Sequence, residues 1–267
     1  MKRLLTWLST VRADLAHAGI SAVVILLVLL IWQAITARGF VSPNFIPTPA
    51  SVWRAFIHVT TEGYQNHTLL FHLGSSMLRM LTGFALACVL AIPLGLGMGT
   101  SEKLRAAIAP FIEFYRPLPP LAYYTILILW LGIGNASKIA LLFLAAFPPI
   151  AINSMAGVQS VSEERIQAAQ SLGAKRWQIF RYVIFPSCLP HIFTGMRVSI
   201  GFTYTTLVSA EIVAASHGIG WMVWNARRWP QSDVIFMGNI VMGATGILLA
   251  WLIKKAEQQV CPWHGKV

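Results

Sequence analysis

The sequence predicts an all-α integral membrane protein with six transmembrane helices. Its 267 residues are 56% hydrophobic and 11% charged, whereas roughly a quarter of the residues in a soluble globular domain are charged. The charges are also unevenly spread, and long runs of the chain contain none. This composition argues against a soluble domain. It also excludes a disordered chain, because the chain has ample apolar surface to bury.

Five uncharged runs of 20 to 24 residues are each long enough for a helix to cross a hydrocarbon core about 30 Å thick. A sixth apolar run, residues 189–215, contains Arg197 and Glu211. These two charges would lie roughly 21 Å apart on a helix, so each can sit near one end of a span. The predicted transmembrane helices cover residues 19–36, 78–99, 121–136, 139–156, 190–213 and 234–253.

The basic residues predict the orientation of the chain. With the N-terminus inside, 13 of the 20 Lys and Arg residues fall in the inside segments and five, including Lys138, fall in the outside loops. Arg79 and Arg197 lie within the ends of spans. Because cytoplasmic loops are enriched in Lys and Arg, we expect both termini in the cytoplasm. The net charge of +11 then needs no nucleic-acid partner.

The outside segment 37–77 predicts a further helix. After three X-Pro pairs, apolar residues recur at helical spacing, namely Val52, Ala55, Phe56 and Val59. This spacing predicts an amphipathic helix on the outer membrane surface.

The histidines and cysteines show no pattern of a metal site or a disulfide framework. The histidines of the outside segment, His58, His67 and His72, have no recognised ligand spacing, so we interpret them as ordinary interfacial residues. The three cysteines are widely spaced, and we interpret them as small hydrophobic residues.

The inside segment 157–188 predicts a helix, a glycine turn and a second helix. Residues 160–163 fit a capping box, which would start the first helix near Val161. Gly173 supplies a helix stop at which a positive φ is available. The second helical stretch runs over residues 174–186.

Three interpretations of this segment compete. It is a connecting loop, a helix-turn-helix that reads DNA, or a helix that docks into a groove of a cytoplasmic partner. Attachment to membrane helices at both ends disfavours DNA reading. Small residues at Ala168, Ala169 and Gly173 would permit a partner to approach closely.

The same segment resembles the EAA loop of the permease subunits of ABC importers. That loop reads Glu-Ala-Ala, three residues, Gly, nine residues and Ile-x-Leu-Pro. The chain has Gln167-Ala168-Ala169, Gly173 and Val183-Ile184-Phe185-Pro186 at the same spacing. Residues 113–122, 130–134 with 137–138, and 169–174 resemble the taurine, aliphatic sulfonate and nitrate branch of that family, and residues 262–265 look most like taurine permeases.

The resemblance implies a type I importer permease fold and a definite set of partners. These are a second copy of the chain, two cytoplasmic ABC ATPase subunits and a periplasmic substrate-binding protein. It further implies that the EAA-like loop is a coupling helix seated in a cleft of the ATPase. Gln167 replaces the Glu that would form a salt bridge there. The implied coupling residues are Arg165, Gln167, Ala168, Ala169, Ser171, Leu172, Gly173 and Ala174.

The resemblance also divides the chain. Residues 1–70 would form an N-terminal region with the first span and the periplasmic amphipathic segment. Residues 71–256 would form the importer transmembrane domain, and residues 257–267 a cytoplasmic tail.

The chain lacks the motif of an ATPase. Only Gly265-Lys266 places Gly before Lys, and both the first glycine and the final hydroxyl of a P-loop are missing. We therefore expect a non-catalytic subunit with no cofactor or metal of its own. ATP and Mg would be bound by the partner ATPase.

Charged residues inside a span are candidates for function. One interpretation of Arg197 and Glu211 places the first at the inner headgroups and the second in the outer water. The other places both along a translocation path, with Arg197 attracting a sulfonate and Thr203 and Thr206 hydrating the path.

We expect a permease subunit of an ATP-driven taurine importer in the bacterial inner membrane, coupled to its ATPases around Gly173. The alternatives are the same machine for another alkanesulfonate, nitrate or a thiamine-precursor-like pyrimidine. An intramembrane enzyme would need a pair such as His-Glu-x-x-His, and the chain has none. A secondary transporter is disfavoured because the sequence has no evident inverted repeat.

Overall fold

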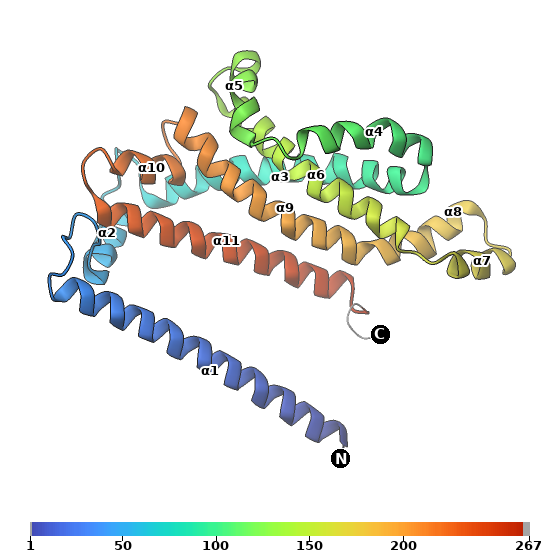
Figure 1. The fold of residues 1–267 in the computed structure, drawn as a ribbon, viewed down its shortest axis with the longest axis horizontal. Coiled ribbons are helices and arrows are strands. Elements are labelled where there is room, and N and C mark those ends of the chain that lie inside the picture. Colours follow the sequence, from blue (N-terminus) through green and yellow to red (C-terminus); the bar gives the residue numbers. More distant parts are fainter. Residues whose placement is uncertain (1, 264–267) are drawn as a thin grey trace.

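The computed structural model describes residues 2–263, with side chains described from Gly19 onward. Nearly all of this part of the chain is helical (Figure 1). The helices are α1 (Lys2–Ala37), α2 (Pro49–Thr61), α3 (Leu69–Thr100), α4 (Glu102–Tyr115), α5 (Pro120–Leu131), α6 (Asn135–Gln159), α7 (Glu163–Ser171), α8 (Arg176–Ile179), a π-helical segment (Phe180–Ile184), α9 (Phe185–Ala214), α10 (Ile219–Ala226) and α11 (Ser232–Val260).

The predicted all-α membrane fold is confirmed, with one correction to the spans. Five helices are long and apolar enough to cross a membrane: α1, α3, α6, α9 and α11. The predicted span 121–136 is instead α5, which has only 12 residues and at about 1.5 Å per residue is too short to cross alone. Gly132, whose φ is 77°, follows its last residue. The segment before α5, expected as a loop, forms α4, and α4 and α5 together lead from the end of α3 back to the start of α6 (Figure 1).

The centre of the bundle is α6, which packs against α3 on one side and α9 on the other. Glycines of α3 bring the first pair into close contact. A Cβ added at Gly95 would lie 2.7 Å from the Ser154 Cβ, and one at Gly99 would lie 2.8 Å from the Val158 Cγ2. Small residues thus let two apolar helices approach closely, which is a common way of packing helices in a membrane.

Helix α2 forms where the sequence predicts it, but in a different setting. Thr48 caps it by accepting a hydrogen bond from the Ser51 amide at 3.1 Å. Its apolar residues Val52, Ala55 and Val59 are buried in a cluster shared with α10 and α11. The apolar face of the predicted helix is therefore covered by neighbouring helices, and the position of the helix at the outer membrane surface stays a prediction.

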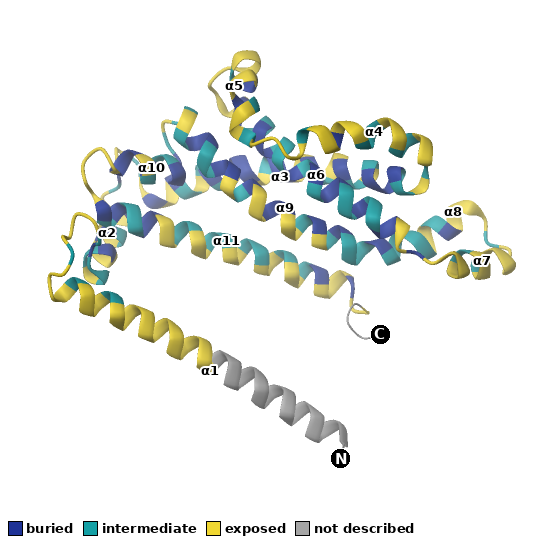
Figure 2. Cartoon of the chain, in the orientation of Figure 1, coloured by how far each residue is buried: buried dark blue, intermediate teal, exposed yellow. Residues whose placement is uncertain are grey.

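Helix α1 stands apart from the bundle, and its residues 19–37 are largely exposed (Figure 2). It contacts the rest of the chain near its end, where the Trp32 Nε1 donates to the Pro47 carbonyl at 2.9 Å. A helix that is apolar all round and uncovered by protein is suited to lipid.

The bundle has two distinct ends (Figure 1). Helices α7 and α8 project from one end, at which α1 begins and α11 ends. Helices α2 and α10 lie at the other. Following the orientation expected from the basic residues, we call the first the inner end and the second the outer end.

Candidate functional site

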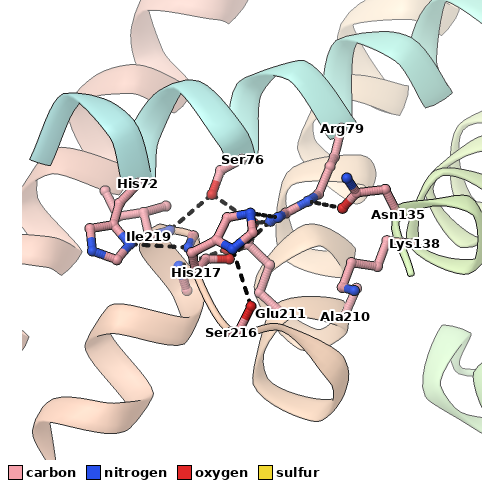
Figure 3. A network of polar contacts seen from close by, with 12 residues as sticks. His72, Ser76, Arg79, Asn135, Lys138, Ala210, Glu211, Ser216, His217 and Ile219 are labelled. Atoms are coloured by element: carbon pink, nitrogen blue, oxygen red, sulfur yellow. Dashed lines mark hydrogen bonds and ion pairs between the residues drawn. The ribbon is translucent and has the colours of Figure 1, made fainter. Parts of the chain in front are cut away.

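Polar side chains gather at the outer end, where α3, α6, α9 and α10 meet, some of them buried and others at the surface (Figure 3). They come from segments that are far apart in sequence. We call this group the outer polar cluster; its members are His72, Ser76, Arg79, Asn135, Lys138, Glu211, Ser216 and His217, together with the backbone amides of residues 218–220.

Helix α3 contributes three of these side chains from one face. His72, Ser76 and Arg79 are spaced by four and three residues, which brings them onto the same side of a helix. All three are buried, and only 3% of Arg79 is exposed. A polar stripe therefore runs along an otherwise apolar span, turned toward the protein interior.

The carboxylate of Glu211, which is fully buried, is the centre of the cluster. Its Oε1 accepts hydrogen bonds from the Ser76 hydroxyl at 2.6 Å and from the Arg79 Nη1 at 2.8 Å. Its Oε2 accepts from the Gly220 amide at 2.9 Å. Both oxygens are thus satisfied. The interpretation that Glu211 reaches the outer water is wrong, because its side chain has no exposed surface.

The cluster also caps the N-terminus of α10. The Gly218 amide donates to the His72 Nδ1 at 3.1 Å, and the Ile219 amide donates to the Ser76 Oγ at 2.9 Å. With the Gly220 amide on Glu211, side chains of α3 and α9 satisfy the amides that a helix start leaves without partners. The negative carboxylate also suits the positive end of the helix dipole.

Glycine at position 218 is a requirement of this arrangement. Its φ is 132°, which side chains rarely tolerate. A Cβ there would also collide with the Glu211 carboxylate. The Gly218 backbone can approach the carboxylate only because it carries no side chain.

Arg79 is enclosed by hydrogen-bond acceptors. Its Nε donates to the Asn135 Oδ1 at 2.8 Å, and its Nη1 also donates to the His217 carbonyl at 3.1 Å. Its Nη2 lies 2.6 Å from the His217 Nε2. Since a guanidinium has no acceptor, the His217 Nε2 must accept, which leaves the ring proton on Nδ1, 3.2 Å from the Ser216 Oγ.

This geometry keeps His217 neutral. Burial and the adjacent Arg79 charge both lower the pKa of His217. Protonation of Nε2 would turn an acceptor into a donor facing a cation, so the charged imidazolium is disfavoured.

Lys138 is the second cation of the cluster. The sequence places it in an outside loop, but the structure places it in the first turn of α6 with only 4% exposed. Its Nζ donates to the carbonyls of Ile133 at 2.7 Å and Gly134 at 3.0 Å. Figure 3 shows it beside Asn135. Within residues 19–263, no group of three His, Cys, Asp or Glu side chains could hold a metal ion.

The structure does not bring the four predicted path residues together. Arg197 forms an ion pair with Glu257 of α11 and lines a groove of about 510 Å³ between α9 and α11. Thr203 is buried and donates to the Ser199 carbonyl of its own helix at 2.8 Å. Thr206 lines a different cavity of about 320 Å³ between α6, α9 and the α4–α5 linker. Glu211 belongs to the outer polar cluster.

The eight predicted coupling residues do lie together at the inner end. Helix α7 has no buried residue, and Leu172 is 89% exposed. The predicted stop is confirmed, because Gly173 has a φ of 80° and the Ala174 amide donates to the Ala169 carbonyl at 3.1 Å.

Two local expectations for this segment are wrong. Helix α7 begins at Glu163 and not near Val161, because the Ser160 hydroxyl donates to the Gly157 carbonyl at 2.8 Å instead of capping α7. The second helix does not stop at Pro186. Instead α8 passes through the π-helical segment into α9, and Pro186 lies in the first turn of α9, where a proline is tolerated.

Sequence reasoning missed the partner of Glu211. The sequence alone places Arg79 at the end of a span and indicates an interfacial position for His72. The available signal was the spacing of His72, Ser76 and Arg79 within one apolar run, which marks a polar helix face.

The buried ion pair gives a first prediction. Arg79→Gln and Glu211→Gln should each lower the free energy of unfolding by about 3–5 kcal/mol, because each leaves a buried charge without its partner. The double variant should lose at least about 1 kcal/mol less than the two single losses combined. Unfolding in mixed micelles measures all three.

The Arg197–Glu257 pair is the matched control, because the Arg197 side chain is 41% exposed. Arg197→Gln and Glu257→Gln should each lower the free energy of unfolding by less than the variants at Arg79 and Glu211. Additive losses at Arg79 and Glu211 would contradict the pairing.

His217 gives a second prediction. Its pKa lies below the unfolded value of about 6.5, so the unfolded chain binds a proton that the folded chain refuses as pH falls below about 6.5. Stability should therefore fall between about pH 7.5 and about pH 5.5, and less steeply in His217→Gln, whose amide oxygen still accepts from Arg79. Melting temperatures of both proteins across this range test it, and parallel curves would exclude His217 as the cause.

Comparison with known proteins places the chain in a family. The family described as "Binding-protein-dependent transport system inner membrane component" matches residues 69–260. The chain is 40% identical over 240 residues to the taurine transport system permease protein TauC of Escherichia coli (strain K12), covering 90% of this chain and 87% of that protein. It is 32% identical over 238 residues to the putative aliphatic sulfonates transport permease protein SsuC of Bacillus subtilis (strain 168), covering 89% and 85% respectively.

A solved structure supports the fold. The inward-facing MetNI methionine ABC transporter matches with a TM-score of 0.59 at 18% sequence identity, covering 73% of this chain and 94% of that chain. The likeness concerns the fold alone, and it agrees with the expected type I permease architecture. The chain is thus a multi-pass membrane protein that belongs to the family of binding-protein-dependent transport system inner membrane components, the permease subunits of ABC transporters.

Proposed function

We propose that this chain is the permease subunit of an ATP-driven importer that carries taurine across the bacterial inner membrane. The observation that carries the proposal is the 40% identity to a taurine permease over 90% of the chain. The similarity to an aliphatic sulfonate permease, at 32% identity, supports another alkanesulfonate as the second candidate.

The exposed α7 segment supports coupling to an ATPase at the inner end. A helix of nine residues is too short to be stable alone, and α7 packs mainly on α8 and the π-helical segment that follow it. Leu172 and Trp177 are 89% and 68% exposed. Apolar side chains on a projecting helix are suited to a groove of a partner protein. Neutral Gln167 contributes hydrogen bonds there but no charge.

The remaining partners follow from this role. Two copies of the chain form the permease, two cytoplasmic ABC ATPases bind ATP and Mg, and a periplasmic protein delivers the substrate. The chain itself is non-catalytic. Both termini are cytoplasmic, which agrees with the excess of basic residues in the inside segments and with the direction of α1 and α11, which respectively begin and end toward the end of the bundle from which α7 projects (Figure 1).

Among the predicted path residues, Arg197 and Thr206 are the better candidates to line the route of the substrate. Each borders an open cavity, whereas Thr203 and Glu211 are fully buried. Glu257 already neutralises the charge of Arg197, so its pull on an anion is weakened.

The coupling turn gives the experiment that tests the proposal. Gly173→Val should reduce taurine uptake by about tenfold or more, because a side chain at this positive φ costs about 1–2 kcal/mol and displaces the turn. ATP hydrolysis should continue without uptake. Proteoliposomes that contain the permease, its ATPases and its binding protein measure both.

Two controls separate coupling from backbone strain. Gly173→Asn should retain more uptake, since Asn tolerates this conformation. Gly39 has a similar φ of 69° and equally open surroundings, but it lies at the outer end. Gly39→Val should therefore leave uptake coupled to ATP hydrolysis. Unchanged uptake in Gly173→Val would contradict the coupling role. An unmodified assembly that imports another alkanesulfonate but not taurine would favour the second candidate.

A further inference from the structure

A pocket of about 640 Å³ lies against the outer polar cluster. One wall is the segment 133–138, which leads into α6, and the other is the segment 213–217, which leaves α9. Arg79 lies between them. The pocket is therefore at the outer end, on the side from which an imported substrate would arrive.

The charges around this pocket do not balance. Arg79 and Lys138 are both buried cations. Within residues 19–263, Glu211 is the only carboxylate that forms an ion pair with either of them, and it pairs with Arg79. Its oxygens already hold Ser76, Arg79 and the Gly220 amide. Lys138 is left as a buried positive charge, which is costly unless an anion compensates it.

Several polar side chains that line the pocket can donate hydrogen bonds. The Lys138 ammonium uses two of its three N–H groups on the carbonyls of Ile133 and Gly134. The Asn135 Oδ1 accepts from Arg79, which leaves its amide NH₂ to donate. The Ser216 hydroxyl can accept from the neutral His217 and donate outward. A ligand with several acceptor oxygens and a negative charge matches this set.

We propose that this pocket is an outer binding site for a small organic anion with an oxyanion head, such as a sulfonate, and that Lys138 supplies the charge that recognises it. The ligand class rests on the proposed function. The site differs from the earlier hypothesis for Arg197, which lies in another cavity and is already paired. No carboxylate of the described residues 19–263 lines the pocket, so the lining favours the acidic end of a ligand over an amine.

Saturation-transfer NMR on the assembled transporter in lipid nanodiscs tests the site directly. The probe is ethanesulfonate, and dimethyl sulfone is its uncharged counterpart. Ethanesulfonate should give a saturable signal and the sulfone none. Lys138→Gln should weaken ethanesulfonate binding by at least about tenfold, the change worth about 1.4 kcal/mol, while Lys138→Arg should retain a measurable part. Lys254→Gln, at an exposed lysine of α11, is the matched control and should bind as the unmodified protein does.

A second variant keeps the test decisive if Lys138→Gln does not assemble. Asn135→Asp retains the oxygen that accepts from Arg79 and adds a negative charge at the pocket, so it should abolish ethanesulfonate binding. Equal binding by the unmodified protein and by either variant would overturn the proposal, as would equal signals from the two probes.

The outcome is separable from the taurine proposal. Lysine-dependent ethanesulfonate binding without taurine uptake would leave the anion site standing and refute taurine as the substrate. Taurine uptake together with ethanesulfonate binding that is unchanged in Lys138→Gln would support taurine as the substrate and refute the anion site.

Discussion

The buried carboxylate of Glu211 is the interaction on which the outer half of the molecule depends. It joins α9 to α3 through Ser76 and Arg79, and to α10 through the Gly220 amide. A buried carboxylate is stable only when its charge is paired and its oxygens are hydrogen-bonded. The fold therefore requires each of these hydrogen-bond partners of Glu211. A further requirement is the absence of a side chain at Gly218, where a Cβ would meet the carboxylate.

The two ends of the bundle, which α9 joins, differ in how their side chains are exposed. At the outer end, Ser76, Arg79 and Glu211 are buried and hydrogen-bond to one another. At the inner end, α7 has no buried residue and leaves Leu172 and Trp177 open to a partner. A continuous helical stretch, Arg176–Ala214, leads from beside α7 through the π-helical segment to Glu211. The turn that follows α7 leads directly into this stretch, which thus connects the proposed ATPase contact with the cluster beside the proposed anion site.

Much of this architecture could be predicted from the sequence, for reasons that are local. Lipid requires long uncharged helices, so the uncharged runs locate the spans, and Gly173 ends α7 because only its own backbone is involved. The rest depends on distant partners. Arg79 and Glu211 are 132 residues apart, and no local spacing joins them. Likewise the Ser160 hydroxyl has a competing carbonyl at Gly157, which a capping-box pattern does not reveal.

In the proposed mechanism, the α7 turn is the contact through which a partner ATPase drives this permease. Cross-linking detects that contact. A cysteine introduced at Leu172, which is 89% exposed, should cross-link to the ATPase, with a yield that changes when ATP is added. A cysteine at Phe45, 78% exposed at the outer end, should not. No cross-link from position 172 in an assembled, ATP-hydrolysing complex, or an equal yield from both positions, would contradict the account.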